Sequence, residues 1–264
     1  MRWPAVVLPL LVMACGSSPP PKAPAPPEPT PTQAPPTDAP VMTQELGSID
    51  DSAVEETFGK LGPDLEACHS AGRARVGQLA GDVSIFLRID ARGQAKYAYF
   101  ESSTLGERGT EKCILDLVLA ATWPAPKGGE AEVRHSLGWD GGQERRPLSW
   151  ESEKVTFALD ASSPTRRAVD KCKRGSTSAI ALTGYVVNGA PPAAQSDPAK
   201  QGKKKSKRRK PARAKREPVG HFKTLGGASP AQDGTGRVDC AIAIVKELAL
   251  PSPGSTTAKV SFSL

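Results

Sequence analysis

Between residues 52 and 139 the spacing of apolar residues changes several times, and each spacing predicts a different element. The first stretch repeats apolar side chains at alternating steps of four and three, as an amphipathic helix does: Val54, Phe58, Leu61, Leu65 and Cys68. Ser52 and Glu55 have the spacing of a capping box at the start of this helix. The Gly62-Pro63 pair predicts a kink within it.

A hairpin, a second helix and a last strand are predicted after this helix. Apolar and polar residues alternate over 81–90, turn at "DARG" and return through 94–102, which is typical of a hairpin with one buried face. Apolar residues at helical spacing over 113–121 predict the second helix, which prolines stop before a strand over 132–139. The order is helix, strand, strand, helix, strand.

The same pattern returns later in the chain. From Cys113 onward, residues that are 127 positions apart correspond without a gap to the end of the chain. Five of these pairs are identical: Cys113 with Cys240, Pro124 with Pro251, Pro126 with Pro253, Val133 with Val260, and Leu137 with Leu264. Upstream, "STLG" at 103–106 matches "KTLG" at 223–226, and 81–93 resembles 178–189. The chain is therefore predicted to carry one module twice. In the second copy the first helix is short, beginning at Ser163 and Pro164.

The first fifteen residues have the features of an export signal. Arg2 precedes an apolar stretch too short to span a bilayer. "VMAC" followed by "GSS" resembles the lipobox of bacterial lipoprotein precursors, which implies that Cys15 is lipidated and becomes the mature N-terminus. Gly16 is not the Asp that retains many such proteins at the inner membrane, so the resemblance favours the outer membrane. An incidental Cys in a buried strand is the alternative.

A proline-rich segment follows, from Ser17 to about Val41. Without apolar periodicity, and with many backbone donors removed by proline, it predicts an extended tether. At about 3.1 Å per residue it would reach roughly 75 Å. A proline-rich recognition ligand is the alternative.

With Cys15 taken by lipid, four cysteines remain and three pairings are open. The repeat selects Cys68 with Cys113 and Cys172 with Cys240, because each pair joins the end of a first helix to the start of a second. Export supplies the oxidising compartment that these bonds need. A zinc site at Cys68-His69 is the alternative, but it lacks a CxxC pair or a second nearby His.

The net charge of +7 is concentrated in one run, residues 200–216, where eleven of seventeen residues are Lys or Arg and none is acidic. Without it, 24 basic residues face 28 acidic ones. The run falls where the first copy has only a hairpin turn, and such dense like charge predicts disorder. No aromatic residue is present to stack bases, so the expected ligand is an envelope polyanion. The candidate binding residues are Lys203, Lys204, Lys205, Lys207, Arg208, Arg209, Lys210, Arg213, Lys215 and Arg216. A solvated loop without a partner is the alternative.

No catalytic constellation is found: the three histidines, His69, His135 and His221, stand in no nucleophile or metal pattern, and "GKLG" and "TLGGASP" lack the Lys and hydroxyl of a phosphate loop. Glu55, Glu56, Asp64 and Glu66 are interpreted as the solvated face of a helix. An unrecognised hydrolase remains a remote alternative.

The paired cysteines, the "IDARG" turn, "SSTLG" and "WPAP" together resemble the TonB-like C-terminal modules of bacterial gliding and envelope proteins of the AgmX/PglI type. The resemblance covers residues 50–139 well, whereas the second copy lacks the Trp of "WPAP". It implies the helix, strand, strand, helix, strand order and a non-catalytic periplasmic interaction or scaffold role. It supplies no binding residues.

The sequence thus predicts an α+β protein of two tandem α-β-β-α-β modules, each with one disulfide, after a disordered proline-rich tether. The expected segments are a signal peptide (1–14), a lipid-anchored linker (15–42), module 1 (43–145) and module 2 (146–264), with a basic disordered insertion at about 193–217. We expect an outer-membrane lipoprotein facing the periplasm or the cell surface, held by its N-terminal lipid only. Its expected partners are envelope proteins and, through the basic run, anionic lipid, lipopolysaccharide or cell wall. No cofactor, metal or specific nucleic acid is expected.

Overall fold

The structure is a computed structural model that describes residues 46–141, 146–160, 162–189 and 219–264. These residues combine helices with β-sheets, as the predicted α+β class requires. They all belong to one compact unit, Thr43–Leu264. The predicted signal peptide and tether lie outside the described residues.

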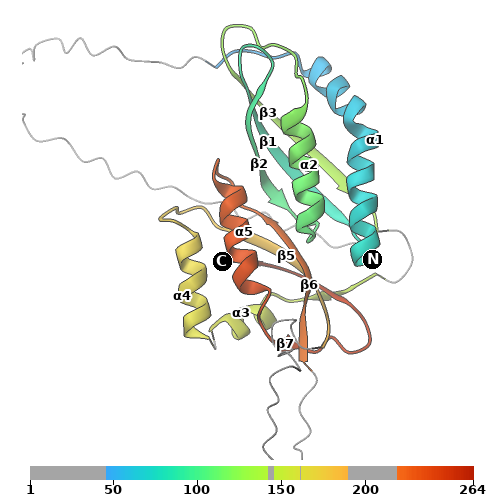
Figure 1. Ribbon diagram of the computed structural model, residues 1–264, viewed down its shortest axis with the longest axis vertical. Coiled ribbons are helices and arrows are strands. Elements are labelled where there is room, and N and C mark those ends of the chain that lie inside the picture. Colours follow the sequence, from blue (N-terminus) through green and yellow to red (C-terminus); the bar gives the residue numbers. More distant parts are fainter. Residues whose placement is uncertain (1–45, 142–145, 161, 190–218) are drawn as a thin grey trace, which may run out of the picture. The chain divides into compact units, whose positions relative to one another are not determined.

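The first half of this unit has the predicted order of two helices and three strands. In chain order these are α1 (Asp51–Val76), β1 (Gly81–Ile89), β2 (Ala95–Ser103), α2 (Arg108–Ala120) and β3 (Ala131–Trp139). The strands form an antiparallel sheet in the order β2-β1-β3, so β3 lies at an edge. Helices α1 and α2 lie side by side against this sheet (Figure 1).

The alternating residues of β1 point into the core, as predicted. Val83, Ile85, Leu87 and Ile89 are all at most 1% exposed and pack beneath the two helices. The expectation of a single buried face is wrong for β1, because Phe86 and Arg88 on its other face are also buried. Cross-strand neighbours cover them: Tyr99 stacks on Phe86, and Arg88 forms ion pairs with Glu130 and Glu132.

The second half repeats this strand order inside a larger sheet. Its elements are β4 (Leu148–Trp150), α3 (Glu153–Asp160), α4 (Ser163–Cys172), β5 (Ala181–Asn188), β6 (Val219–Ala228), α5 (Gly234–Val245), β7 (Leu250–Pro251) and β8 (Ala258–Ser263). The sheet order is β4-β8-β5-β6-β7, whose centre, β6-β5-β8, corresponds to β2-β1-β3. The additional strand β4 pairs in parallel with β8.

The predicted helix boundaries need correction in four places. Asp50, not Ser52, caps α1, because its carboxylate accepts hydrogen bonds from the amides of Ser52 and Ala53. Helix α1 continues through Pro63 to Val76, so Cys68 lies two turns before its end. Helix α2 begins at Arg108, so Cys113 lies inside it. In the second half, the cap position of α4 is Ser162, one residue earlier than predicted.

The two halves pack against each other. Tyr185 of β5 and Ala228 of β6 belong to the apolar core of the first half and are at most 2% exposed. The hydroxyl of Tyr185 accepts a hydrogen bond from the Ala80 amide at 3.3 Å. The sequence does not predict whether the two copies pack together, and the structure shows that they do.

Candidate functional site

Both predicted disulfides are present, and each links the two main helices of one half. Cys68 of α1 is bonded to Cys113 of α2, and Cys172 of α4 to Cys240 of α5. The Cα atoms lie 5.8 Å and 5.6 Å apart, within the usual range for a disulfide. Since Cys68 is oxidised to a disulfide, it is not available as the thiolate ligand of the alternative zinc site.

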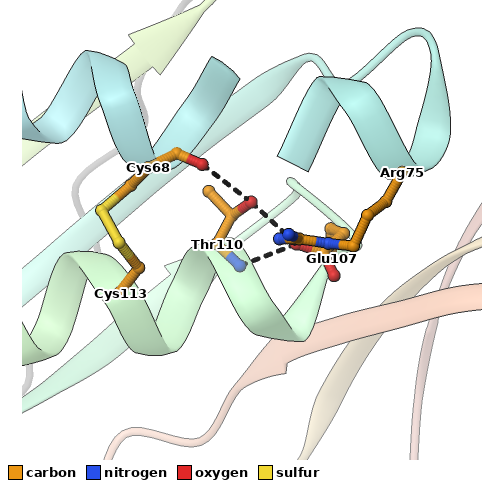
Figure 2. The surroundings of a disulfide bond; sticks show 5 residues. All are labelled: Cys68, Arg75, Glu107, Thr110 and Cys113. Atoms are coloured by element: carbon orange, nitrogen blue, oxygen red, sulfur yellow. Dashed lines mark hydrogen bonds and ion pairs between the residues drawn. A yellow bond between two sulfur atoms is a disulfide. The ribbon is translucent and has the colours of Figure 1, made fainter. Parts of the chain in front are cut away.

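Beside the first disulfide, Glu107 organises the start of α2 (Figure 2). One carboxylate oxygen accepts hydrogen bonds from the amide and the hydroxyl of Thr110, at 2.7 Å and 2.8 Å, and from Arg75 of α1 at 2.6 Å. Burial favours the neutral acid, but the bonds from Arg75 and Thr110 outweigh it and lower the pKa of Glu107. Glu107 therefore caps α2 and ties it to α1.

A second glutamate on α2, Glu111, joins the two halves. Its side chain is fully buried and accepts hydrogen bonds from the Ser103 hydroxyl at 2.6 Å and from the Gly227 amide of β6 at 2.9 Å. Arg108 lies 3.1 Å from Glu111 and also binds Asp239 of α5 at 2.7 Å. Burial raises the pKa of Glu111 despite these partners. This polar junction fixes α2 against the second half.

A shallow groove of 350 Å³ runs between α1 and the edge strand β3. Its α1 wall is one stripe at helical spacing: Glu55, Gly59, Gly62 and Glu66. A Cβ atom added at Gly59 or Gly62 would meet nothing within 4 Å, so the two glycines leave the middle of the groove open.

The β3 wall of the groove is aromatic. His135 stacks on Phe58 with ring centroids 3.7 Å apart, and its Nδ1 lies 3.1 Å from a Glu55 oxygen. The Trp139 indole donates a hydrogen bond to Glu66 at 3.1 Å. The groove therefore has an acidic group at each end and an apolar wall between them.

The other two histidines have structural partners. His69 is 2% exposed, its Nε2 lies 2.8 Å from the Leu79 carbonyl oxygen, and its ring stacks on Trp139. His221 Nδ1 lies 2.9 Å from the Gly189 carbonyl oxygen. Among the described residues, both hydrogen-bond to backbone carbonyl groups and neither to a Ser, Thr or Cys side chain. Across the described parts of the chain, no three His, Cys, Asp or Glu side chains are arranged to hold a metal ion.

Several predicted site residues lie outside the described residues: Cys15 and all ten candidate basic residues between 203 and 216. The strands on either side of the basic run are described, however. Asn188 at the end of β5 pairs with Gly220 of β6, and the Gly189 amide bonds to the Val219 carbonyl at 2.8 Å. The run therefore interrupts the β5–β6 hairpin at its turn, as the repeat predicted.

Sequence reasoning missed the groove and the junction. Glu55, Glu56, Asp64 and Glu66 are exposed, as predicted for a solvated helix face. The sequence did not indicate that Glu55 and Glu66 also contact ring nitrogens of β3. The available signal was the stripe at 55, 59, 62 and 66, with two glycines inside a helix.

Among the described residues no helix is long and apolar enough to cross a membrane. Comparisons of the chain with protein-family models, with curated proteins and with solved structures find no match.

Proposed function

We propose that this protein is a non-catalytic lipoprotein of the bacterial envelope that binds other envelope proteins through two tandem TonB-like modules. The lipobox-like "VMAC" at Cys15 supports the anchor, and the two disulfides suit an oxidising compartment. The strand orders β2-β1-β3 and β6-β5-β8 support the tandem modules.

The contact surface that we propose is the open edge of β3 together with the groove beside it. A sheet edge presents unpaired backbone donors and acceptors, which an extended segment of another protein can pair with. In the part of the chain that the structure describes, β3 pairs along its length with β1 alone. On the side away from β1, a β-bridge between Leu46 and Glu130 lies just before the first residue of β3.

The second half supports this proposal, because there the matching edge is occupied. Strand β4 pairs in parallel with β8 at residues 258–260, which the offset of 127 aligns with 131–133 of β3. A short segment thus adds to this kind of edge within the same chain. The observation that carries the proposal is that, among the described residues, no strand adds to β3 as β4 adds to β8, while a groove lined by glycine lies open beside β3.

The experiment is site-specific photo-crosslinking in intact cells from two positions on β3, Ser136 and Gly138, and from Lys171 on α4 as an exposed control. We expect discrete adducts from β3 and none from Lys171. The variant Gly59→Leu, which fills the groove, should remove the β3 adducts, whereas Gly59→Ala should keep them.

Two outcomes would count against this surface. One is the same adducts from Lys171 as from β3; the other is β3 adducts that Gly59→Leu leaves at full yield. Circular dichroism of the purified Gly59→Leu protein shows whether the variant is folded, so a loss of adducts through misfolding is recognised.

A second candidate function is polyanion binding through the basic run 200–216. The observation that favours it is the pairing of Asn188 with Gly220, because the run lies in the sequence between these two paired residues. The proposed ligands are anionic lipid, lipopolysaccharide phosphates or cell-wall carboxylates, and a loop variant described in the Discussion tests them.

A further inference from the structure

The groove between α1 and β3 carries an exposed carboxylate at each end. The side chains of Glu55 and Glu66 are 66% and 57% exposed, and none of the described residues that line the groove is Lys or Arg. In the part of the chain that the structure describes, each of these carboxylates lies near a histidine, His135 or His69, which is charged only when protonated. The groove therefore presents two negative charges without a permanent cation beside them.

The two carboxylates are held at fixed places along β3. A Glu55 oxygen lies 3.1 Å from His135 Nδ1, and Glu66 accepts a hydrogen bond from the Trp139 indole at 3.1 Å. His135 and Trp139 are four residues apart on the strand, so their side chains lie on the same face, about 14 Å apart at about 3.4 Å per residue. The distance between the two negative charges thus matches four residues of an extended chain.

The middle of the groove is open and uncharged. Leu137 lies between His135 and Trp139 in the β3 wall, and Gly59 and Gly62 lie between the two glutamates in the α1 wall. Neither glycine would bring an added Cβ within 4 Å of another atom, so an apolar side chain from outside has room here. Contact with such a side chain removes apolar surface from water.

The other face of β3 has a different charge pattern. Arg134, with its side chain 57% exposed, forms an ion pair with Glu101 at 3.0 Å. A Cβ added at Gly138 would meet Asp82. That face therefore offers one cation and one acid where the α1 face offers two acids.

We propose that the groove selects an extended segment with Lys or Arg at two positions four residues apart and an apolar residue midway between them. The segment adds to the free edge of β3, so alternate side chains face α1. The basic residues meet Glu55 and Glu66, and the apolar residue lies over the two glycines. This inference rests on the proposed contact surface at β3 and names the chemistry of the partner.

The test is a titration of the full chain with blocked peptides, followed by the NMR amide signals of β3. The first peptide is acetyl-Thr-Lys-Thr-Val-Thr-Lys-Thr-amide, which is nearly symmetric and can pair in either direction. The second, acetyl-Thr-Lys-Thr-Val-Lys-Thr-Thr-amide, has the same composition but puts its two lysines on opposite faces of a strand. The third has Glu in place of both lysines of the first.

We expect the first peptide to shift the β3 signals in a saturable way and to bind more tightly than the other two. Raising the salt concentration should reduce this advantage, because the ion pairs are exposed. The second peptide keeps the charge but loses at least one of the two contacts with glutamate, and the third meets like charge.

Variants of α1 locate the contact. The double variant Glu55→Gln, Glu66→Gln keeps both side-chain oxygens and should weaken binding of the first peptide about 2- to 30-fold, the range for two exposed ion pairs. Asp64→Asn removes an exposed acid of the same helix that does not line the groove, and it should bind like the parent. Thermal unfolding of each variant checks that the fold is kept.

Three results would overturn the inference: equal affinity for the two lysine peptides, equal affinity for the acidic peptide, or unchanged affinity in the double variant. The crosslinks from Ser136 and Gly138 separate this failure from that of the surface itself. If β3 gives adducts in cells but the three peptides bind alike, the charge pattern is wrong and the surface stands. If neither adducts nor peptide binding is seen, both proposals fail.

Discussion

Glu107, the N-cap of α2, and Glu111, one turn further along, have pKa values that are shifted in opposite directions. Glu107 accepts three hydrogen bonds at one carboxylate oxygen, two from Thr110 and one from Arg75, and these lower its pKa. Glu111 is enclosed completely between the halves, and burial raises its pKa. The charged form of Glu107 therefore stabilises the fold, whereas the charged form of Glu111 costs stability relative to the unfolded chain.

This contrast predicts opposite pH trends for two variants. Glu107→Gln should lower the free energy of unfolding at pH 7 by about 1–3 kcal/mol, and the loss should shrink as the pH falls below the ordinary glutamate pKa of 4.5. The stabilisation from the raised pKa of Glu111 is present below that pH and is lost as the pH rises. The parent's advantage over Glu111→Gln should therefore be largest in acid. Urea denaturation from pH 3.5 to 7 measures both, and parallel trends would contradict the assignment.

At the scale of elements, hydrophobic spacing was enough to predict the β1–β2 hairpin and both helices of the first half, because their apolar residues all face one core. The ends of the helices were harder to predict than their existence. Glu107 is not among the preferred capping residues, so α2 was expected to begin near Cys113. Helix α3 was missed because its buried residues are only Val155 and Leu159, with Phe157 between them 77% exposed.

The candidate sites were less predictable than the fold. The disulfide pairing followed from the repeat alone, since equivalent positions must form equivalent bonds. The groove and the contact between the two halves depend on side chains from distant segments, such as His135 against Phe58, or Lys259 against Ala80. No local pattern encodes such a contact.

Helix α1 allows a test of whether the glycines that line the groove, Gly59 and Gly62, lower the stability of the protein. A glycine inside a helix is about 1 kcal/mol less favourable than alanine, and a Cβ at Gly59 would meet nothing. Gly59→Ala should therefore stabilise the protein by about 1 kcal/mol in chemical denaturation. Gly62→Ala should gain less, because a Cβ in a helical residue before Pro63 clashes with the proline ring. An equal gain at both positions would show that Pro63 imposes no such limit.

At the scale of the whole molecule, the basic run predicts salt-dependent binding. Each Lys or Arg near an anionic surface contributes about 1 kcal/mol, screened over roughly 10 Å at 0.1 M salt. Replacing residues 200–216 with a Gly-Ser loop of equal length should reduce binding to anionic vesicles and to purified cell wall, most strongly at low salt. Equal binding by both proteins, or binding that salt does not weaken, would identify the run as a solvated loop.

The proposed anchor predicts a change in fractionation. Cys15→Ser removes the thiol that lipidation needs, so the protein should leave the membrane fraction and become soluble. The membrane content of the parent and of the variant is compared after cell lysis, with a Cys172→Ser, Cys240→Ser double variant as a control for cysteine loss in general. Retention of the Cys15→Ser protein at the parental level would exclude a lipid anchor at this residue.

The junction at Glu111 has a consequence for how the protein is turned over in the cell. Gly227 supplies the amide that satisfies this carboxylate, and Tyr185 of the second half belongs to the core of the first, so the interior of the first half is exposed when the second half unfolds. Among the described residues, the core of the second half is built from its own residues alone. We therefore expect damage in the second half to make the first half open to proteases, whereas damage in the first half leaves the second core covered by its own residues.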